Sequence, residues 1–115
     1  MKNDHPWIEL CPGIRRQTKT SGQTMYQMLA ELEANVRMPE HSHPNEQIVH
    51  ILSGRMKLIA NGVGHDLTAG DSYYLGANVP HSVETHEKTR VLDTFSPPRE
   101  EYLALDREKG RGEPA

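Results

Sequence analysis

Turn signals recur at short intervals through the middle of this chain: Ser53-Gly54, Asn61-Gly62 and Ala69-Gly70. Asn-Gly is the dipeptide that type I′ hairpin turns favour, because both central positions of that turn need positive φ. The runs between these turns are apolar or alternating, and we predict that they are strands: residues 48–52, 56–60 and 63–67. Many short strands at regular spacing are typical of a β-barrel or a β-sandwich, so we expect an all-β fold.

Residues 25–33 extend this pattern upstream. Apolar or aromatic residues occupy alternate positions there: Tyr26, Met28, Ala30 and Leu32. This alternation predicts a strand. A short helix is the competing interpretation, because Met, Leu, Ala and Glu are good helix formers. The strand is favoured because neither a helix cap nor an apolar stripe of helical period fits the segment.

The flanking segments complete the expected sheet. We predict a strand over residues 14–20 with a basic outer face, formed by Arg15, Arg16 and Lys19. Further short strands are expected over residues 72–75, 82–84 and 89–95. Pro97-Pro98 ends the sheet, because proline cannot donate to a strand ladder. Residues 100–109 are expected to form a short helix or an arm, and residues 110–115 a frayed tail.

The length of the chain limits its organisation. The 115 residues suit a single domain, with a barrel over about 25–95, an N-terminal strand or arm over 1–20 and a C-terminal tail over 100–115. Only 35% of the residues are hydrophobic, so the core is modest. Small β-domains often bury additional apolar area by self-association. We therefore expect a homodimer, formed through the outward face of Ile48, His50 and Leu52.

Composition and charge argue against several classes of protein. The net charge is -3 with both signs interspersed, and the absence of a basic stripe argues against a nucleic-acid partner. No apolar run approaches the roughly 20 residues of a membrane span. The single Cys11 cannot form an internal disulfide, and the N-terminus lacks the apolar region of a signal peptide. We expect a cytoplasmic protein.

Two histidines separated by one residue, His41 and His43, carry the strongest functional signal. In an extended strand such residues project from the same side, because side chains alternate with period two. Gln47 lies four residues beyond His43 and keeps this parity, and His81 could close the set if the sheet curls back on itself. Imidazole nitrogens and an amide oxygen suit a borderline divalent metal. We therefore predict a site for one divalent transition metal at His41, His43, Gln47 and His81.

Glu46 is the alternative to Gln47 as the fourth ligand. Parity places Glu46 on the opposite face from His43, but a β-bulge would reverse that placement, so both remain open. Three imidazoles and a neutral amide would leave the metal its full charge, which favours Lewis-acid polarisation over redox cycling. Zinc, nickel, iron and manganese are all candidates. The other histidines are not expected to be ligands: His5, His50, His65 and His86.

A second informative stretch runs from Leu92 to Arg99. Asp93 and Phe95 share one strand face, and Arg99 follows the rigid Pro97-Pro98 corner. A carboxylate, an aromatic wall and a guanidinium near a metal would suit a small sugar acid, because arginine pairs bidentately with carboxylates and aspartate can transfer protons. The competing interpretation is a surface Asp–Arg pair beside a core phenylalanine.

The spacing of these residues resembles the two motifs of the cupins, small β-barrels of the jelly-roll type. Four residues match the end of the first motif: His41, His43, Gln47 and Gly54. Gly70 and His81 match the second motif at the right separation. Other motif positions hold different residues here: Asn35, Gly76, Asn78 and Thr85, with Gln47 in place of a carboxylate. The resemblance implies a double-stranded β-helix, the cupin barrel.

Among cupins, the chain is similar to the KdgF-type proteins of pectin degradation, through His-Ser-His-Pro-x-Glu-Gln and Val-Leu-Asp-Thr-Phe-Ser-Pro-Pro-Arg-Glu. This similarity implies a metal-dependent, isomerase-like or tautomerase-like enzyme that linearises 4,5-unsaturated uronates to keto acids. It implies the metal ligands His41, His43, Gln47 and His81. It assigns catalysis to Asp93 and Arg99, and binding of a carboxylated sugar to Phe95 and Arg99. A metal-dependent dioxygenase and a non-catalytic small-molecule-binding cupin are the alternatives.

Overall fold

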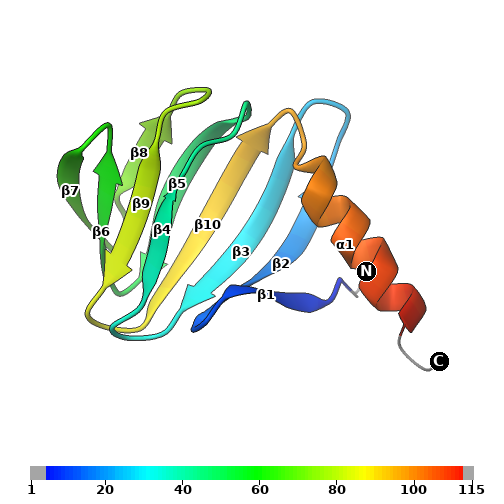
Figure 1. Ribbon diagram of the computed structural model, residues 1–115, viewed down its shortest axis with the longest axis horizontal. Helices are drawn as coiled ribbons and strands as arrows, with labels where there is room; N and C mark the ends of the chain where they lie inside the picture. Colours follow the sequence, from blue (N-terminus) through cyan, green and yellow to red (C-terminus); the bar gives the residue numbers. More distant parts are fainter. Residues whose placement is uncertain (1–4, 113–115) are drawn as a thin grey trace.

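The computed structural model describes residues 5–112, which form two antiparallel sheets and one helix (Figure 1). The six-stranded sheet has the order β1-β2-β3-β10-β5-β8, and the four-stranded sheet has the order β4-β9-β6-β7. Strands that are neighbours in space are therefore often distant in sequence. This interleaving is that of a jelly roll, and it confirms the predicted all-β double-stranded β-helix.

The elements follow the chain in this order: β1 (Trp7–Cys11), β2 (Ile14–Ser21), β3 (Tyr26–Leu32), β4 (Arg37–His41), β5 (Glu46–Ser53), β6 (Arg55–Ala60), β7 (Val63–Thr68), β8 (Ser72–Leu75), β9 (His81–Thr85), β10 (Thr89–Ser96) and α1 (Glu100–Gly112). The turn between β6 and β7 has φ of 50° at Asn61 and 78° at Gly62, as its Asn-Gly dipeptide predicts. Strand β3 occupies the segment where alternation favoured a strand over a helix.

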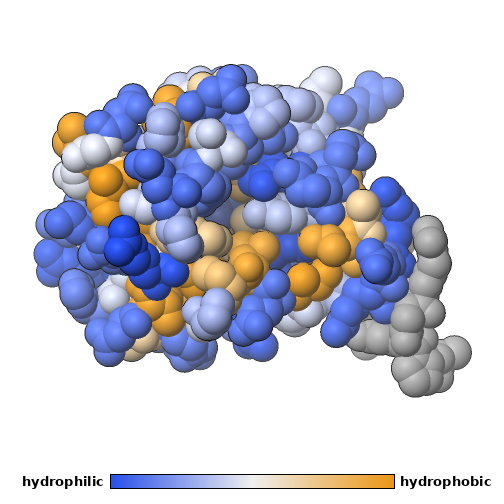
Figure 2. Space-filling model, in the orientation of Figure 1, coloured by the Kyte–Doolittle hydropathy of each residue, from blue (hydrophilic) through white to orange (hydrophobic). Residues whose placement is uncertain are grey.

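The core lies between the two sheets. Each sheet contributes the inward side chains of its strands, including Ala30 and Ile51 from one sheet and Met56 and Leu58 from the other. Ile51 and Leu58 are essentially inaccessible to solvent. The face drawn in Figure 2 is mainly hydrophilic, with apolar side chains gathered toward its lower half. Burial of the inward residues fixes the register of each strand, because a slip by one residue would turn them toward solvent.

Helix α1 packs beside β2 at one end of the six-stranded sheet (Figure 1). Its first amides, at Tyr102 and Leu103, donate to the carbonyl of Arg99. Glu100 and Glu101 in the first turn complement the positive end of the helix dipole. The expected tail over residues 110–115 is wrong in part, because the helix continues to Gly112, and residues 113–115 lie outside the described part of the chain.

The expected basic outer face of residues 14–20 also needs correction. Arg15 is exposed, but Arg16 is completely buried. Its Nη1 donates to a carboxylate oxygen of Asp106 over 2.7 Å. Alternation along the strand turns Arg16 inward, and the buried ion pair with helix α1 makes that placement possible.

No helix among residues 5–112 is long and apolar enough to cross a membrane. The cytoplasmic location expected from the sequence stays a prediction.

Candidate metal centre

Three histidines meet at one end of the barrel. His41 ends β4 and His81 begins β9, and these two residues are register partners in the four-stranded sheet. His43 follows in the loop after β4. The prediction that His41 and His43 project from one side of a continuous strand is therefore correct in placing His41 on a strand and wrong in placing His43 there. One ring nitrogen from each of the three histidines lies within 4.8 Å of the others. The triad could therefore hold a metal ion.

Backbone carbonyls orient all three imidazole rings. The Nδ1 atoms of His41, His43 and His81 lie 2.9, 3.0 and 2.8 Å from the carbonyl oxygens of Pro39, Asn45 and Val79. A carbonyl only accepts hydrogen bonds, so a neutral His41 or His81 ring carries its proton on Nδ1. His43 has an acceptor at both ring nitrogens, and a metal at Nε2 would require its Nδ1–H form. The lone pair of each Nε2 is then free for a ligand. Metal-binding histidines are commonly oriented by such outer hydrogen bonds.

Gln47 faces the triad with its amide oxygen. Its Oε1 lies 3.1 Å from Nε2 of His43, while its Nε2 donates to Oδ1 of Asp93 over 2.9 Å. In the neutral Nδ1–H tautomer of His43, both atoms of the first contact are acceptors. Two facing acceptors repel each other unless a proton or a cation lies with them. A cation at this position would satisfy both, so the donor set fits a divalent metal.

Glu46 lies on the other side of the strand. The register between β5 and β10 is continuous from Val49 to Glu46, so no bulge reverses the parity of these residues. The Glu46 carboxylate is exposed, and it accepts a hydrogen bond from the Tyr74 hydroxyl over 2.7 Å. Of the two candidates for the fourth position, the structure therefore brings Gln47 and not Glu46 to the triad.

Burial keeps two of the histidines neutral. Desolvation lowers the pKa of His43, and it lowers the pKa of His81 to about 4. Arg99 and the neighbouring imidazoles reinforce both shifts. At neutral pH these two side chains are thus unprotonated, which is the form that binds a metal.

Asp93, Phe95 and Arg99 line the same pocket as His41, Gln47 and His81, and apolar side chains form its inner wall. Asp93 is buried, and desolvation raises its pKa to about 6, against the lowering effects of Gln47 and Arg99. The Phe95 ring lies 5.5 Å from the His43 ring in an edge-on arrangement. The alternative of a surface Asp–Arg pair does not describe this site, because both residues are buried.

Arg99 is held by packing. Its guanidinium lies over the rings of Phe95, at 4.9 Å, and Tyr102, at 4.2 Å. Nη2 lies 3.3 Å from a carboxylate oxygen of the more exposed Glu101. The Nε atom of Arg99 is buried and has no hydrogen-bond partner among the described residues. An unpaired buried donor of this kind is available to an anionic ligand.

Two residues at the site were missed by the sequence analysis. Asn45 is buried; its backbone carbonyl lies against His43, and its side-chain Nδ2 donates to the carbonyl of Pro97 over 2.6 Å. Asn45 thereby connects the loop that carries His43 to the Pro97-Pro98 segment before Arg99. Tyr102 lines the pocket from helix α1. No spacing pattern in the sequence indicates either contact.

The remaining histidines do not converge on the triad. Nδ1 of His50 lies 2.7 Å from the Ser72 hydroxyl, and Nε2 of His65 lies 3.2 Å from the Tyr73 hydroxyl. His5 lies near Asp106, with Nδ1 4.0 Å from a carboxylate oxygen. Within residues 5–112, the grouping of possible metal ligands is that of His41, His43 and His81.

The metal-free protein should respond to acid through groups of opposite effect: the buried histidines His81 and His43, whose pKa values are lowered, and Asp93, whose pKa is raised. A histidine in the unfolded chain has a pKa of about 6.5, whereas burial lowers the pKa of His81 to about 4. Between these pH values the unfolded state binds the proton and the folded state does not, so His81 destabilises the fold as the pH falls. Asp93, with its pKa raised to about 6, binds a proton first in the folded state and stabilises the fold over the same interval. We expect chelator-treated Asp93→Asn to lose about 2 kcal/mol of unfolding free energy between about pH 7 and 5, and the wild type to lose less.

Urea denaturation at about pH 7, 6 and 5 measures this difference. A wild-type protein that loses as much stability as Asp93→Asn would contradict the opposing role of Asp93.

Comparisons with known proteins place the chain in a family. No curated protein matches it. Among solved structures, an RmlC-like cupin from Shewanella frigidimarina NCIMB 400 is similar, with 24% identity over 86% of this chain and 89% of that one, and a TM-score of 0.81. KdgF from a Halomonas species has 22% identity over 85% and 91% of the two chains, and a TM-score of 0.79.

A salicylate 1,2-dioxygenase from Pseudaminobacter salicylatoxidans is also similar, with 19% identity over 84% of this chain and 30% of that one, and a TM-score of 0.73. At these identities the three structures show a common fold. The sequence profile of the cupin domain matches residues 28–95. Because this match spans more than half of the chain, the protein belongs to the cupin-domain family.

Proposed function

We propose that this cupin is a metal-dependent enzyme that linearises 4,5-unsaturated uronates to keto acids, in carbohydrate catabolism of the pectin or alginate type. The observation that supports it is the meeting of two groups in one pocket. The histidines and Gln47 form one group, and Asp93, Phe95 and Arg99 form the other. The first group suits a metal and the second suits an acidic sugar. The similarity of both sequence motifs to KdgF-type cupins points in the same direction.

One divalent transition metal would be held by His41, His43, Gln47 and His81. Zinc, nickel, iron and manganese all accept such a donor set. When bound, the metal would supply Lewis-acid polarisation of a substrate oxygen.

Arg99 would bind the substrate carboxylate, because its buried Nε offers a free donor. Phe95 would form the wall against which the sugar lies. Asp93 would move the proton. Its Oδ1 is engaged by Gln47, so Oδ2 is the oxygen for transfer, and a pKa of about 6 lets it accept and release a proton near neutrality.

The proton balance of the reaction needs such a group. Ring opening transfers the proton of the anomeric hydroxyl to the ring oxygen, breaks the bond between the anomeric carbon and that oxygen, and leaves an aldehyde at the anomeric carbon and an enol at the former ring oxygen. Tautomerisation then moves the enol proton to the alkene carbon that does not carry this oxygen, which leaves a ketone at the carbon that does and yields the keto acid. One side chain that alternates between carboxylate and carboxylic acid can carry both transfers.

The test combines product identification with oxygen measurement. Metal-loaded protein is mixed with a 4,5-unsaturated monouronate, the product is identified by NMR, and dissolved oxygen is recorded. We expect the linear keto acid without oxygen consumption. Oxygen uptake that follows substrate loss would favour the dioxygenase alternative, and a substrate that binds without conversion would favour a binding cupin.

We also propose that the protein is a homodimer. Large apolar side chains are exposed on the outer face of β5 and β8: Ile48 is 48%, Leu52 44% and Tyr74 59% accessible. Ile48 and Tyr74 are register partners, so their side chains lie next to each other. Exposed apolar residues that cluster in this way are typical of protein interfaces.

Light scattering at micromolar concentration should therefore give the mass of two chains. The double substitution Ile48→Lys/Leu52→Lys should give the mass of one, because charges placed on this face would have to be buried without partners. Val63→Lys is the matched control, since Val63 is 58% exposed on β7 of the other sheet. A monomeric wild type would contradict the dimer.

A further inference from the structure

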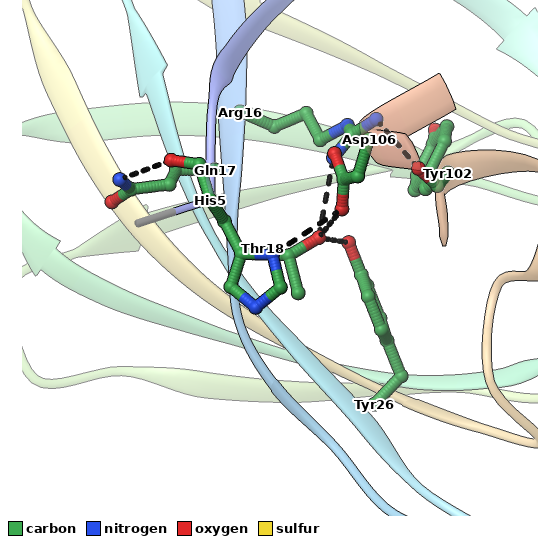
Figure 3. A network of polar contacts seen from close by, with 7 residues as sticks. All are labelled: His5, Arg16, Gln17, Thr18, Tyr26, Tyr102 and Asp106. Atoms are coloured by element: carbon green, nitrogen blue, oxygen red, sulfur yellow. Dashed lines mark hydrogen bonds and ion pairs between the residues drawn. The ribbon is translucent and has the colours of Figure 1, made fainter. Parts of the chain in front are cut away.

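Helix α1 joins the pocket to a buried polar network on β2. Arg16 Nη1 donates to Asp106 Oδ1 over 2.7 Å, and its Nη2 donates to the Tyr102 carbonyl over 3.1 Å (Figure 3). The Thr18 hydroxyl donates to Asp106 Oδ2 over 2.6 Å and lies 2.6 Å from the Tyr26 hydroxyl. Asp106 and Tyr102 lie one helical turn apart, so the network fixes the turn of the helix that faces the pocket.

Tyr102 connects this network to Arg99. The Arg16 guanidinium lies over the Tyr102 ring at 4.6 Å, and the Arg99 guanidinium lies over the same ring at 4.2 Å. Tyr26 makes a second connection between the network and the pocket. Its hydroxyl contacts Thr18, and its ring lies 6.0 Å from the Phe95 ring. Arg99 therefore takes its position from packing against aromatic rings, since the Glu101 carboxylate with which it forms an ion pair is 60% exposed and contributes little.

We propose that Asp106 and Arg16, which lie outside the pocket, are positioning residues for substrate binding. They seat helix α1 so that the Tyr102 ring holds the Arg99 guanidinium against Phe95, with Nε free for the carboxylate. This inference rests on the proposed function, because it assumes that Arg99 binds the carboxylate of an acidic sugar. It predicts that affinity for a uronate depends on an ion pair that the ligand never touches.

The energetics support such a role. Preorganising a donor removes part of the entropy cost of binding. A cation–π contact that is shielded from water is stronger than an exposed one. Loss of the Asp106 charge leaves Arg16 buried without its ion-pair partner, which favours displacement of the helix. The Arg99 side chain then loses one of its two aromatic contacts.

The experiment observes the Arg99 Nε–H group directly by NMR in zinc-loaded, nitrogen-15-labelled protein. Zinc is chosen because it is diamagnetic, and the Arg99→Lys spectrum identifies the signal by its disappearance. Two nearby rings should shift this signal from the position of a free arginine, and burial should slow its exchange with water. The probe is galacturonate, which lacks the reactive alkene, and galactose is the uncharged control.

Four variants separate positioning from direct contact. Asp106→Asn and Tyr102→Leu should each weaken galacturonate binding roughly tenfold, which corresponds to about 1.4 kcal/mol. In both variants the Arg99 signal should move toward that of a free arginine. Tyr102→Phe keeps the ring and should bind within about twofold of the wild type. If Asp106→Asn does not fold, the Arg16→Met/Asp106→Leu double variant replaces the ion pair by apolar volume. It lacks the contacts of the Arg16 guanidinium with the Tyr102 ring and carbonyl, so it should show the same weakening.

The outcomes distinguish this inference from the proposed function. A folded Asp106→Asn, or double variant, with wild-type galacturonate affinity and an unchanged Arg99 signal overturns the positioning role and leaves the proposed function standing. Tyr102→Phe as weak as Tyr102→Leu would show that the hydroxyl contacts the ligand, which also overturns it. Wild-type protein that binds galacturonate no better than galactose refutes carboxylate recognition. The change of the Arg99 signal in Asp106→Asn then still decides whether Asp106 positions Arg99.

Discussion

Asp93→Asn is expected to lower turnover of the unsaturated uronate by about 10²–10⁴-fold, the usual contribution of general acid–base catalysis. The amide keeps the shape of the side chain and can still accept the hydrogen bond from Gln47, but it cannot carry a proton. The metal content should stay at the wild-type value, because Asp93 is hydrogen-bonded to Gln47 and is not itself one of the proposed metal ligands. Turnover is measured by absorbance and metal content by elemental analysis of the same sample.

The same substitution should stabilise the metal-free protein. Burial raises the Asp93 pKa from 3.8 to about 6, so above that pH the folded protein holds a desolvated charge. Replacing it with a neutral amide should increase the free energy of unfolding by up to about 3 kcal/mol near neutral pH. Loss of activity together with a gain in stability is the signature of a catalytic group. Wild-type turnover in Asp93→Asn would contradict the assignment.

The double substitution His41→Ala/His43→Ala should abolish stoichiometric metal binding. Each histidine supplies one of few ligands, and its Nδ1 hydrogen bond to a backbone carbonyl orients it before the metal arrives. The remaining two groups, Gln47 and His81, cannot hold a transition metal against a chelator. Metal content after dialysis against EDTA and reloading is the measurement.

A matched control is His50→Ala, because His50 is a half-buried histidine on the outer side of β5. It should retain wild-type metal content. If the double variant retains as much metal as His50→Ala, the metal lies elsewhere.

The sequence predicted the elements in which local pattern and tertiary environment agree. Strand β3 alternates along its sequence, and β5 to β7 end at the turn dipeptides Ser53-Gly54, Asn61-Gly62 and Ala69-Gly70, so their signals are local. His43 and Gln47 lie together, with His43 Nε2 3.1 Å from Gln47 Oε1, but the loop between β4 and β5 brings them there and not the strand parity on which the prediction relied. Strand β4 was not predicted, because Pro39 and charged residues interrupt its alternation.

Contacts between distant residues could not be predicted in this way. Arg16 looked like part of a basic surface because the carboxylate that permits its burial, Asp106, lies 90 positions away. The hydrogen bond from Asn45 to Pro97 spans 52 positions. Helix α1 continues through Gly110, where local composition favours a frayed end, because its first turns are anchored by Asp106 and Tyr102. In each case the stabilising partner belongs to another element.

Uronate linearisation by this cupin can be measured as the rate at which a 4,5-unsaturated monouronate loses its conjugated-alkene absorbance. The rate is compared for metal-replete wild type, chelated wild type and buffer alone. We expect that metal-replete protein accelerates the decay well above the spontaneous rate, and that chelated protein does not. Decay at the spontaneous rate in the presence of metal-replete protein would contradict the assignment of this cupin to uronate linearisation.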